Sequence, residues 1–202
     1  MPMVSPDFFK EKMLGSTEIL SLLSHDDNAK LKIFTTESNN MSRSINVCLT
    51  DLESGRMIFP DFNQKITWDK AHMDSFVEAS LLKMPVPNIT VVTDKLRNLF
   101  VVIDGYQRLM TLALYTERLP EKYLNEQTQK LMGFSLNGIS QNSKWYGKSY
   151  KELNVFDRKT LTDTYTINFN EVYLDNSESF DFAYYMYRKL SSSSYCADDN
   201  SN

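Results

Sequence analysis

Five consecutive residues, 104–108 (DGYQR), bring together the groups that an anion-binding turn requires. They follow the apolar run 99–103 and precede an apolar-periodic segment, so they lie where a strand passes into a helix. The first N–H groups of a helix lack intrahelical partners and carry partial positive charge, and Gly105 lets the backbone approach a ligand closely. Arg108 adds a planar fork of donors that suits phosphate oxygens. The sequence therefore predicts a phosphate site at this junction.

The polar residues of this turn also have structural roles open to them. Asp104 is the natural N-cap of the helix, a role worth about 1 kcal/mol, or it orients the loop and a nucleotide-bound Mg²⁺ as carboxylates do in phosphoryl transfer. Gln107 positions a phosphate or a water, or lies on the surface. Arg108 contacts phosphate, forms a buried ion pair, or faces solvent. The residue types alone leave these alternatives open.

A second polar segment, 60–68 (PDFNQKITW), precedes another predicted helix. Its residues Asn63, Gln64 and Lys65 are candidates for a second wall of the same site. Trp68 is more typical of a core anchor than of a ligand contact.

Composition and charge limit the classes of function. The 202 residues carry a net charge of -4 with 42% hydrophobic residues, which is typical of one folded domain and gives no general attraction to DNA or anionic membranes. The two cysteines and two histidines have no partners at metal-ligand or disulfide spacing, so no metal site is predicted. No stretch approaches the roughly 18 apolar residues of a membrane span, and we expect a soluble cytoplasmic protein.

The order of elements predicts an α+β fold with a small mixed sheet packed by helices. Residues 1–43 are expected to form a helical extension and linker, with a loop over 36–42; residues 44–190 form the main domain, and 191–202 a mobile polar tail. Caps and apolar spacing place the following elements in the main domain: helices 44–54, 69–83, 105–118, 121–132 and 175–190, and strands 56–59, 88–93, 99–103 and 164–174. The strands 88–93 and 99–103 are expected to form an antiparallel hairpin.

Several motifs in this order resemble one known family. They are the segment PDFNQKITW, the connector PVP at 85–87, the run VVIDGYQRLMTL at 101–112, and GKSYKEL at 147–153. Together they resemble the N-terminal domain of the GmrSD restriction endonucleases, within the ParB/sulfiredoxin-like superfamily. The residues DGYQR match the family signature DGQQR.

The resemblance implies a domain that binds a nucleoside triphosphate (NTP), with Mg²⁺, in bacterial or phage DNA defence or counter-defence. On this interpretation Asp104, Gln107 and Arg108 serve the phosphates as catalytic residues of an NTP hydrolase, and Gly105, Tyr106, Asn63, Gln64 and Lys65 contribute to nucleotide binding. The nucleotide base stays open, as does a protein partner or homo-oligomer.

The chain departs from the family pattern in three places. Asn63-Gln64 stands where the family has Gln-Arg, so one positive charge is absent and only the neighbouring Lys65 compensates. Tyr106 replaces the first Gln of the signature and either stacks on a base or packs. Third, residues 186–192 (MYRKLSS) only faintly match the start of the F-x-x-x-N-[ST]-G-G segment with which the family continues, often into a nuclease. No HNH-type metal site can be built from His25 and His72, so we expect no nuclease activity from this chain alone. The alternative function is a catalytically inactive module that binds a protein or DNA.

Overall fold

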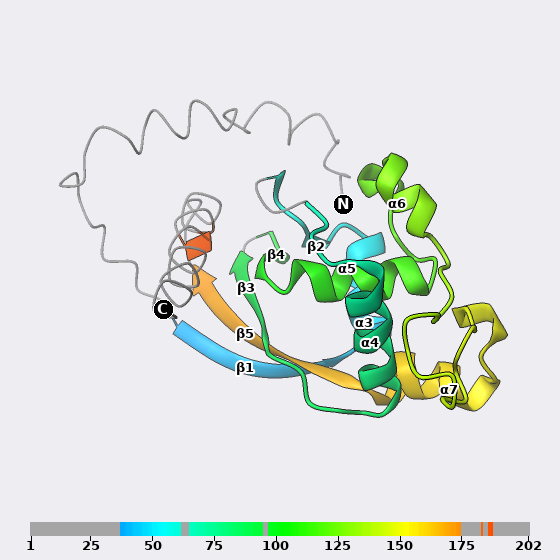
Figure 1. Ribbon diagram of the computed structural model, residues 1–202. Coiled ribbons are helices and arrows are strands. Elements are labelled where there is room, and N and C mark those ends of the chain that lie inside the picture. Colours follow the sequence, from blue (N-terminus) through cyan, green and yellow to red (C-terminus); the bar gives the residue numbers. More distant parts are fainter. Residues whose placement is uncertain (1–36, 62–64, 95–96, 175–182, 184–185, 188–202) are drawn as a thin grey trace, which may run out of the picture. The chain divides into compact units, whose positions relative to one another are not determined.

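The computed structural model describes residues 37–61, 65–94, 97–174, 183, 186 and 187 (Figure 1). The elements predicted within residues 1–36 and the tail 191–202 lie outside these described residues. Of the helix predicted over 175–190, Ala183, Met186 and Tyr187 are described, and all three are helical.

A mixed five-stranded sheet organises the described part of the chain, in the order β1-β5-β3-β4-β2. Its pairs β1/β5 and β3/β4 are antiparallel, whereas β3/β5 and β2/β4 are parallel. The strands are β1 (Glu37–Ser44), β2 (Met57–Ile58), β3 (Ile89–Asp94), β4 (Leu99–Asp104) and β5 (Thr166–Leu174). This sheet confirms the predicted α+β class and the predicted β3–β4 hairpin.

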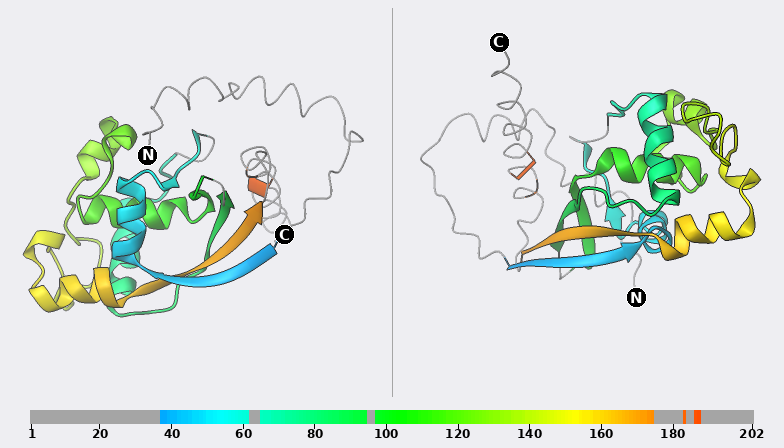
Figure 2. Two further views of the ribbon diagram at one scale, coloured as in Figure 1. Left: turned by 180° about the vertical axis from the view of Figure 1, so that it is seen from behind. Right: turned by 60° about the horizontal axis from the view of Figure 1, so that its bottom comes forward.

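Three helices pack on one face of the sheet and enclose the main hydrophobic core (Figures 1 and 2). They are α3 (Ile45–Glu53), α4 (Lys70–Leu81) and α5 (Tyr106–Tyr115). The predicted caps are confirmed for the first two, because the Ser44 hydroxyl accepts from the Val47 N–H and the Asp69 carboxylate accepts from the His72 N–H. Shorter elements follow: η2 (Glu121–Tyr123), α6 (Glu126–Leu131), η3 (Tyr150–Glu152), α7 (Val155–Lys159) and the π-helical turn η4 (Thr160–Thr164).

Strand β1 contradicts the loop predicted over 36–42. The segment is polar, but it is an edge strand that pairs along its whole length with β5, so its backbone groups are satisfied without an apolar sequence. Ion pairs of Arg43 also hold β1 in place. Its Nη1 lies 3.1 Å from Oδ2 of Asp51 on α3, and its Nη2 lies 2.8 Å from Oε1 of Glu171 on β5. Local sequence gives no sign of these distant partners.

The single helix predicted over 121–132 is also wrong, because two short helices occupy this segment. Asn125 separates them: its side chain accepts from the Thr128 N–H, and the Thr128 hydroxyl accepts from the Asn125 N–H. This capping box starts α6 anew after η2.

Gly105 joins β4 to α5 in a conformation that suits glycine, with φ of 101°. A β-carbon at this position would lie 2.7 Å from Cγ1 of Ile89 on β3. The close approach of the turn to the sheet therefore depends on the absent side chain.

We predict that Gly105→Ala destabilises the protein by about 3 kcal/mol, since the left-handed backbone costs roughly 1–2 kcal/mol and the steric overlap with Ile89 adds about as much. Urea unfolding followed by circular dichroism measures the change. Gly55→Ala is the matched control: Gly55 also has positive φ (75°), but its added β-carbon would meet no atom within 4 Å. An equal loss in both variants would contradict the steric part of this explanation.

Candidate functional site

A β-bulge sets the direction of Asp104 at the end of β4. Thr90 pairs with Asp104 and Val91 pairs with Val102, so the register shifts by one residue at Ile103. Such a bulge turns the residues after it and is common beside functional sites. Cross-strand partners point to the same face of a sheet, which places Asp104 on the face of Thr90.

Asp104 is not the N-cap of α5, contrary to the prediction. The N-cap is Gly105, and no side chain caps the helix. Leu109 N–H donates to the Gly105 carbonyl as the first turn closes. The Asp104 carboxylate instead turns to Arg108 on the next turn of the helix, because charge pairing with a buried guanidinium is stronger than a cap. The N-cap residue of α5 therefore provides no side-chain acceptor.

Arg108 is buried and bonded to three protein acceptors. Its Nη2 lies 2.9 Å from Oδ2 of Asp104, and its Nη1 donates to the carbonyl oxygens of Pro87 and Asn88, the latter at 3.2 Å. The Arg108 side chain is 10% exposed, whereas that of Asp104 is 57% exposed. The Asp104 carboxylate is therefore exposed to solvent and paired with the buried guanidinium of Arg108.

Gln107 joins the signature turn to the second polar segment. Its Nε2 donates to the Lys65 carbonyl at 2.7 Å, and its Oε1 accepts from the N–H groups of Thr67 (3.1 Å) and Trp68 (3.4 Å). The two segments singled out in the sequence are therefore in contact through backbone groups. The amide of Gln107 acts here as a clamp on the chain that leads into α4.

Tyr106 packs in the core. Its ring lies edge-on to Phe59, with 4.8 Å between centroids, and the residue is 3% exposed. Burial raises the pKa of its hydroxyl to about 12. Of the two roles considered for Tyr106, the structure supports packing and not base stacking.

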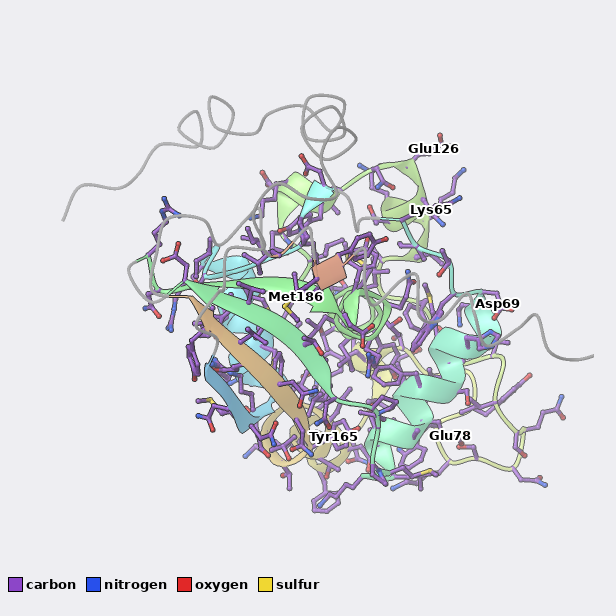
Figure 3. The ribbon with its side chains drawn as sticks, turned by 90° about the vertical axis from the view of Figure 1, so that its left-hand side faces the viewer. Lys65, Asp69, Glu78, Glu126, Tyr165 and Met186 are labelled. Carbon is purple, nitrogen blue, oxygen red and sulfur yellow. The ribbon has the colours of Figure 1, made fainter. Side chains whose placement is uncertain are left out.

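The remaining predicted contacts divide into described and undescribed residues. Lys65 is exposed at the start of the short stretch that runs to Asp69 and α4 (Figure 3). Asn63 and Gln64 lie outside the described residues. Trp68 packs edge-on to Phe76 with 5.4 Å between centroids, as expected for a core anchor.

Two asparagines near the site were not singled out from the sequence. Asn88 precedes β3, and its Nδ2 donates to Oδ1 of Asn170 on β5 at 2.9 Å. The alternation of polar and apolar residues in TINFNEVYL places Asn168 and Asn170 on one face, which was an available signal. Their proximity to Asp104 could not be predicted from the sequence, because it depends on the order of the strands in the sheet.

Among the described residues, no group of three or more His, Cys, Asp or Glu side chains is arranged to hold a metal ion. No helix in the same part of the chain has the length and apolar character needed to cross a membrane.

These features define an α+β domain of ParB-like type with a strand-to-helix DGYQR turn. The chain belongs to the family described as GmrSD restriction endonuclease, N-terminal domain, whose sequence model matches residues 45–202. The match confirms the family resemblance of the motifs and places the chain in a family of restriction systems. Searches of curated proteins and of solved structures each give no match.

We predict that Gln107→Ala releases the segment that leads into α4, because three backbone groups lose their partner. The N–H of Thr67 should exchange with solvent at least about tenfold faster, equivalent to roughly 1.4 kcal/mol of lost protection. Hydrogen exchange followed by NMR measures this rate. Gln141→Ala, in an exposed loop, should leave the Thr67 rate unchanged, and unaltered exchange in Gln107→Ala would contradict the clamp.

Proposed function

We propose that this domain binds a nucleoside triphosphate together with Mg²⁺ at the DGYQR turn. One observation carries the proposal: an exposed Asp104 carboxylate, supported by buried Arg108, stands beside the uncapped N-terminus of α5. A helix start suits phosphate oxygens, since its first N–H groups have no intrahelical acceptor and carry partial positive charge.

The chemistry of the donor set fits a nucleotide-bound Mg²⁺. This ion is usually held by one or two carboxylates plus substrate phosphates, so a single exposed aspartate suffices and a cluster of acidic side chains is not needed. Asp104 would hold the ion, which would supply charge neutralisation for the phosphates. We also propose that the exposed Lys65, whose carbonyl accepts from Gln107, contacts the outer phosphates.

Arg108 supports this site in a different way from direct phosphate binding. Three protein acceptors already engage its Nη atoms. In the proposal Arg108 orients Asp104 and adds positive potential beneath the phosphates.

Hydrolysis is a further step, and it needs a group that orients water. Gln107 was the candidate, but its amide is engaged by three backbone groups. We therefore propose nucleotide binding as the function. Hydrolysis is tested separately, by measuring phosphate release. We place this activity in the cytoplasm, where nucleotides and the DNA addressed by restriction systems are present.

The same engagement of Arg108 favours a second candidate function. If the guanidinium serves only the fold, the domain is a non-catalytic module that binds a protein or DNA within a restriction system. Nucleotide titration separates the two candidates, because the module requires no triphosphate.

We predict that isothermal titration calorimetry with ATP, GTP, CTP and UTP detects binding of at least one of them when Mg²⁺ is present. Asp104→Asn should weaken that binding by about tenfold or more and remove its dependence on Mg²⁺, since an amide is a poor ligand for this ion. This substitution preserves the shape of the side chain. It also removes the charge that pairs with buried Arg108, so thermal unfolding of the variant is measured to show that the domain stays folded.

Arg97→Ala is the matched control. Arg97 pairs with Asp94 at 2.8 Å, a local Arg–Asp pair at the other end of the same two strands. Its loss should leave nucleotide affinity unchanged. The absence of any heat with all four nucleotides at millimolar concentration would reject the proposal, and so would equal affinity of wild type and Asp104→Asn.

A further inference from the structure

Hydrogen bonds connect the DGYQR turn to the middle of the sheet. The guanidinium of Arg108 donates to the backbone carbonyl of Asn88, and the side chain of Asn88 donates to the side chain of Asn170. Asn88 therefore uses its main chain for Arg108 and its amide for β5. Both asparagine side chains are half-buried.

The strand register places the same residues in one row. Asn170 on β5 lies beside Thr90 on β3, and Thr90 lies opposite Asp104 on β4. Partners across a sheet share a face, and neighbouring strands are about 4.8 Å apart, so Asn170 lies roughly 10 Å from the Asp104 backbone along this row. Figure 3 looks onto the sheet with β5 and β3 in front of α3.

The residues of this row that lie beyond Asp104 carry no charge. Beyond Asp104 it continues through Thr90 and Asn170 to Asn40, which pairs with Asn170 on β1, and these three residues are polar and uncharged. A neutral polar row suits the sugar and base of a nucleotide and gives no support for a second phosphate.

Each amide of the asparagine pair has one further polar atom available. The bond between Asn88 Nδ2 and Asn170 Oδ1 uses one atom of each amide. The other two, Oδ1 of Asn88 and Nδ2 of Asn170, take part in no hydrogen bond within the described part of the chain. One acceptor and one donor on two bonded amides are the kinds of group that asparagine uses to hydrogen-bond the edge of a nucleobase.

We propose that the Asn88–Asn170 amide pair contacts the base of the bound nucleotide and sets the base preference of the site. This inference rests on the proposed nucleotide function and adds the specificity element to it. The phosphates lie at Asp104 and the α5 N-terminus, the ribose lies over Thr90, and the base reaches the amide pair. Arg108 links the two ends through its contacts with Asp104 and Asn88.

The test compares nucleoside triphosphates with inorganic tripolyphosphate, each with Mg²⁺, by calorimetry on the full chain. Tripolyphosphate has no base, so it reports on the phosphate end alone. Asn170→Ala and Asn88→Ala should each weaken binding of the preferred nucleotide by about tenfold and reduce discrimination among the four bases. Tripolyphosphate affinity should stay within about twofold of wild type, because the Asn88 contact with Arg108 is through the backbone.

Asn168→Ala is the matched control. Asn168 lies on the same strand and face, one row further along, and its Oδ1 accepts from the Ser42 hydroxyl at 2.5 Å. Its removal should leave base preference intact. Thermal unfolding of each variant checks folding, and the two alanine variants on different segments provide independent measurements.

The outcomes separate this inference from the proposed function. If wild-type protein binds tripolyphosphate and all four nucleotides equally, the base-reading role is wrong and phosphate binding stands. If the alanine variants lose tripolyphosphate and nucleotide affinity in parallel, the pair is only structural and the inference is wrong. If wild-type protein binds none of these ligands, the proposed function fails and this inference fails with it.

Discussion

The buried guanidinium of Arg108 is the constraint on which the site depends. A buried charge is costly unless it is paired and hydrogen-bonded. Arg108 meets this requirement with a carboxylate at the end of β4 and two carbonyls just before β3. Its bonds therefore fix where α5 starts relative to both strands. The position of Asp104, and of every ligand group argued from it, follows from this one side chain.

Local features were readable from the sequence because their causes lie within a few residues. The Ser44 and Asp69 caps, the apolar stripes behind them and the β3–β4 hairpin all follow from short-range patterns, and the structure confirms them. The family motifs also allowed the fold class to be predicted. The contact between the two polar segments was expected as two walls of a site, and Gln107 makes it through backbone groups.

Long-range pairing explains what the sequence could not reveal. Strand β1 is polar and forms because β5 lies beside it; Ser42 and its partner Asn168 are 126 residues apart. Asp104 looked like a helix cap because the residue type and position fit one. The actual arrangement required knowing that Arg108 would be buried against the start of β3, a fact of packing that no local pattern contains.

The bulge at Ile103 determines the side of the sheet on which Asp104 lies. The side chains of a strand alternate between faces, so the one extra residue decides which side of the sheet the signature aspartate occupies. A residue gained or lost between Val102 and Gly105 would therefore turn the Asp104 carboxylate to the opposite face, even with every residue of the DGYQR turn unchanged.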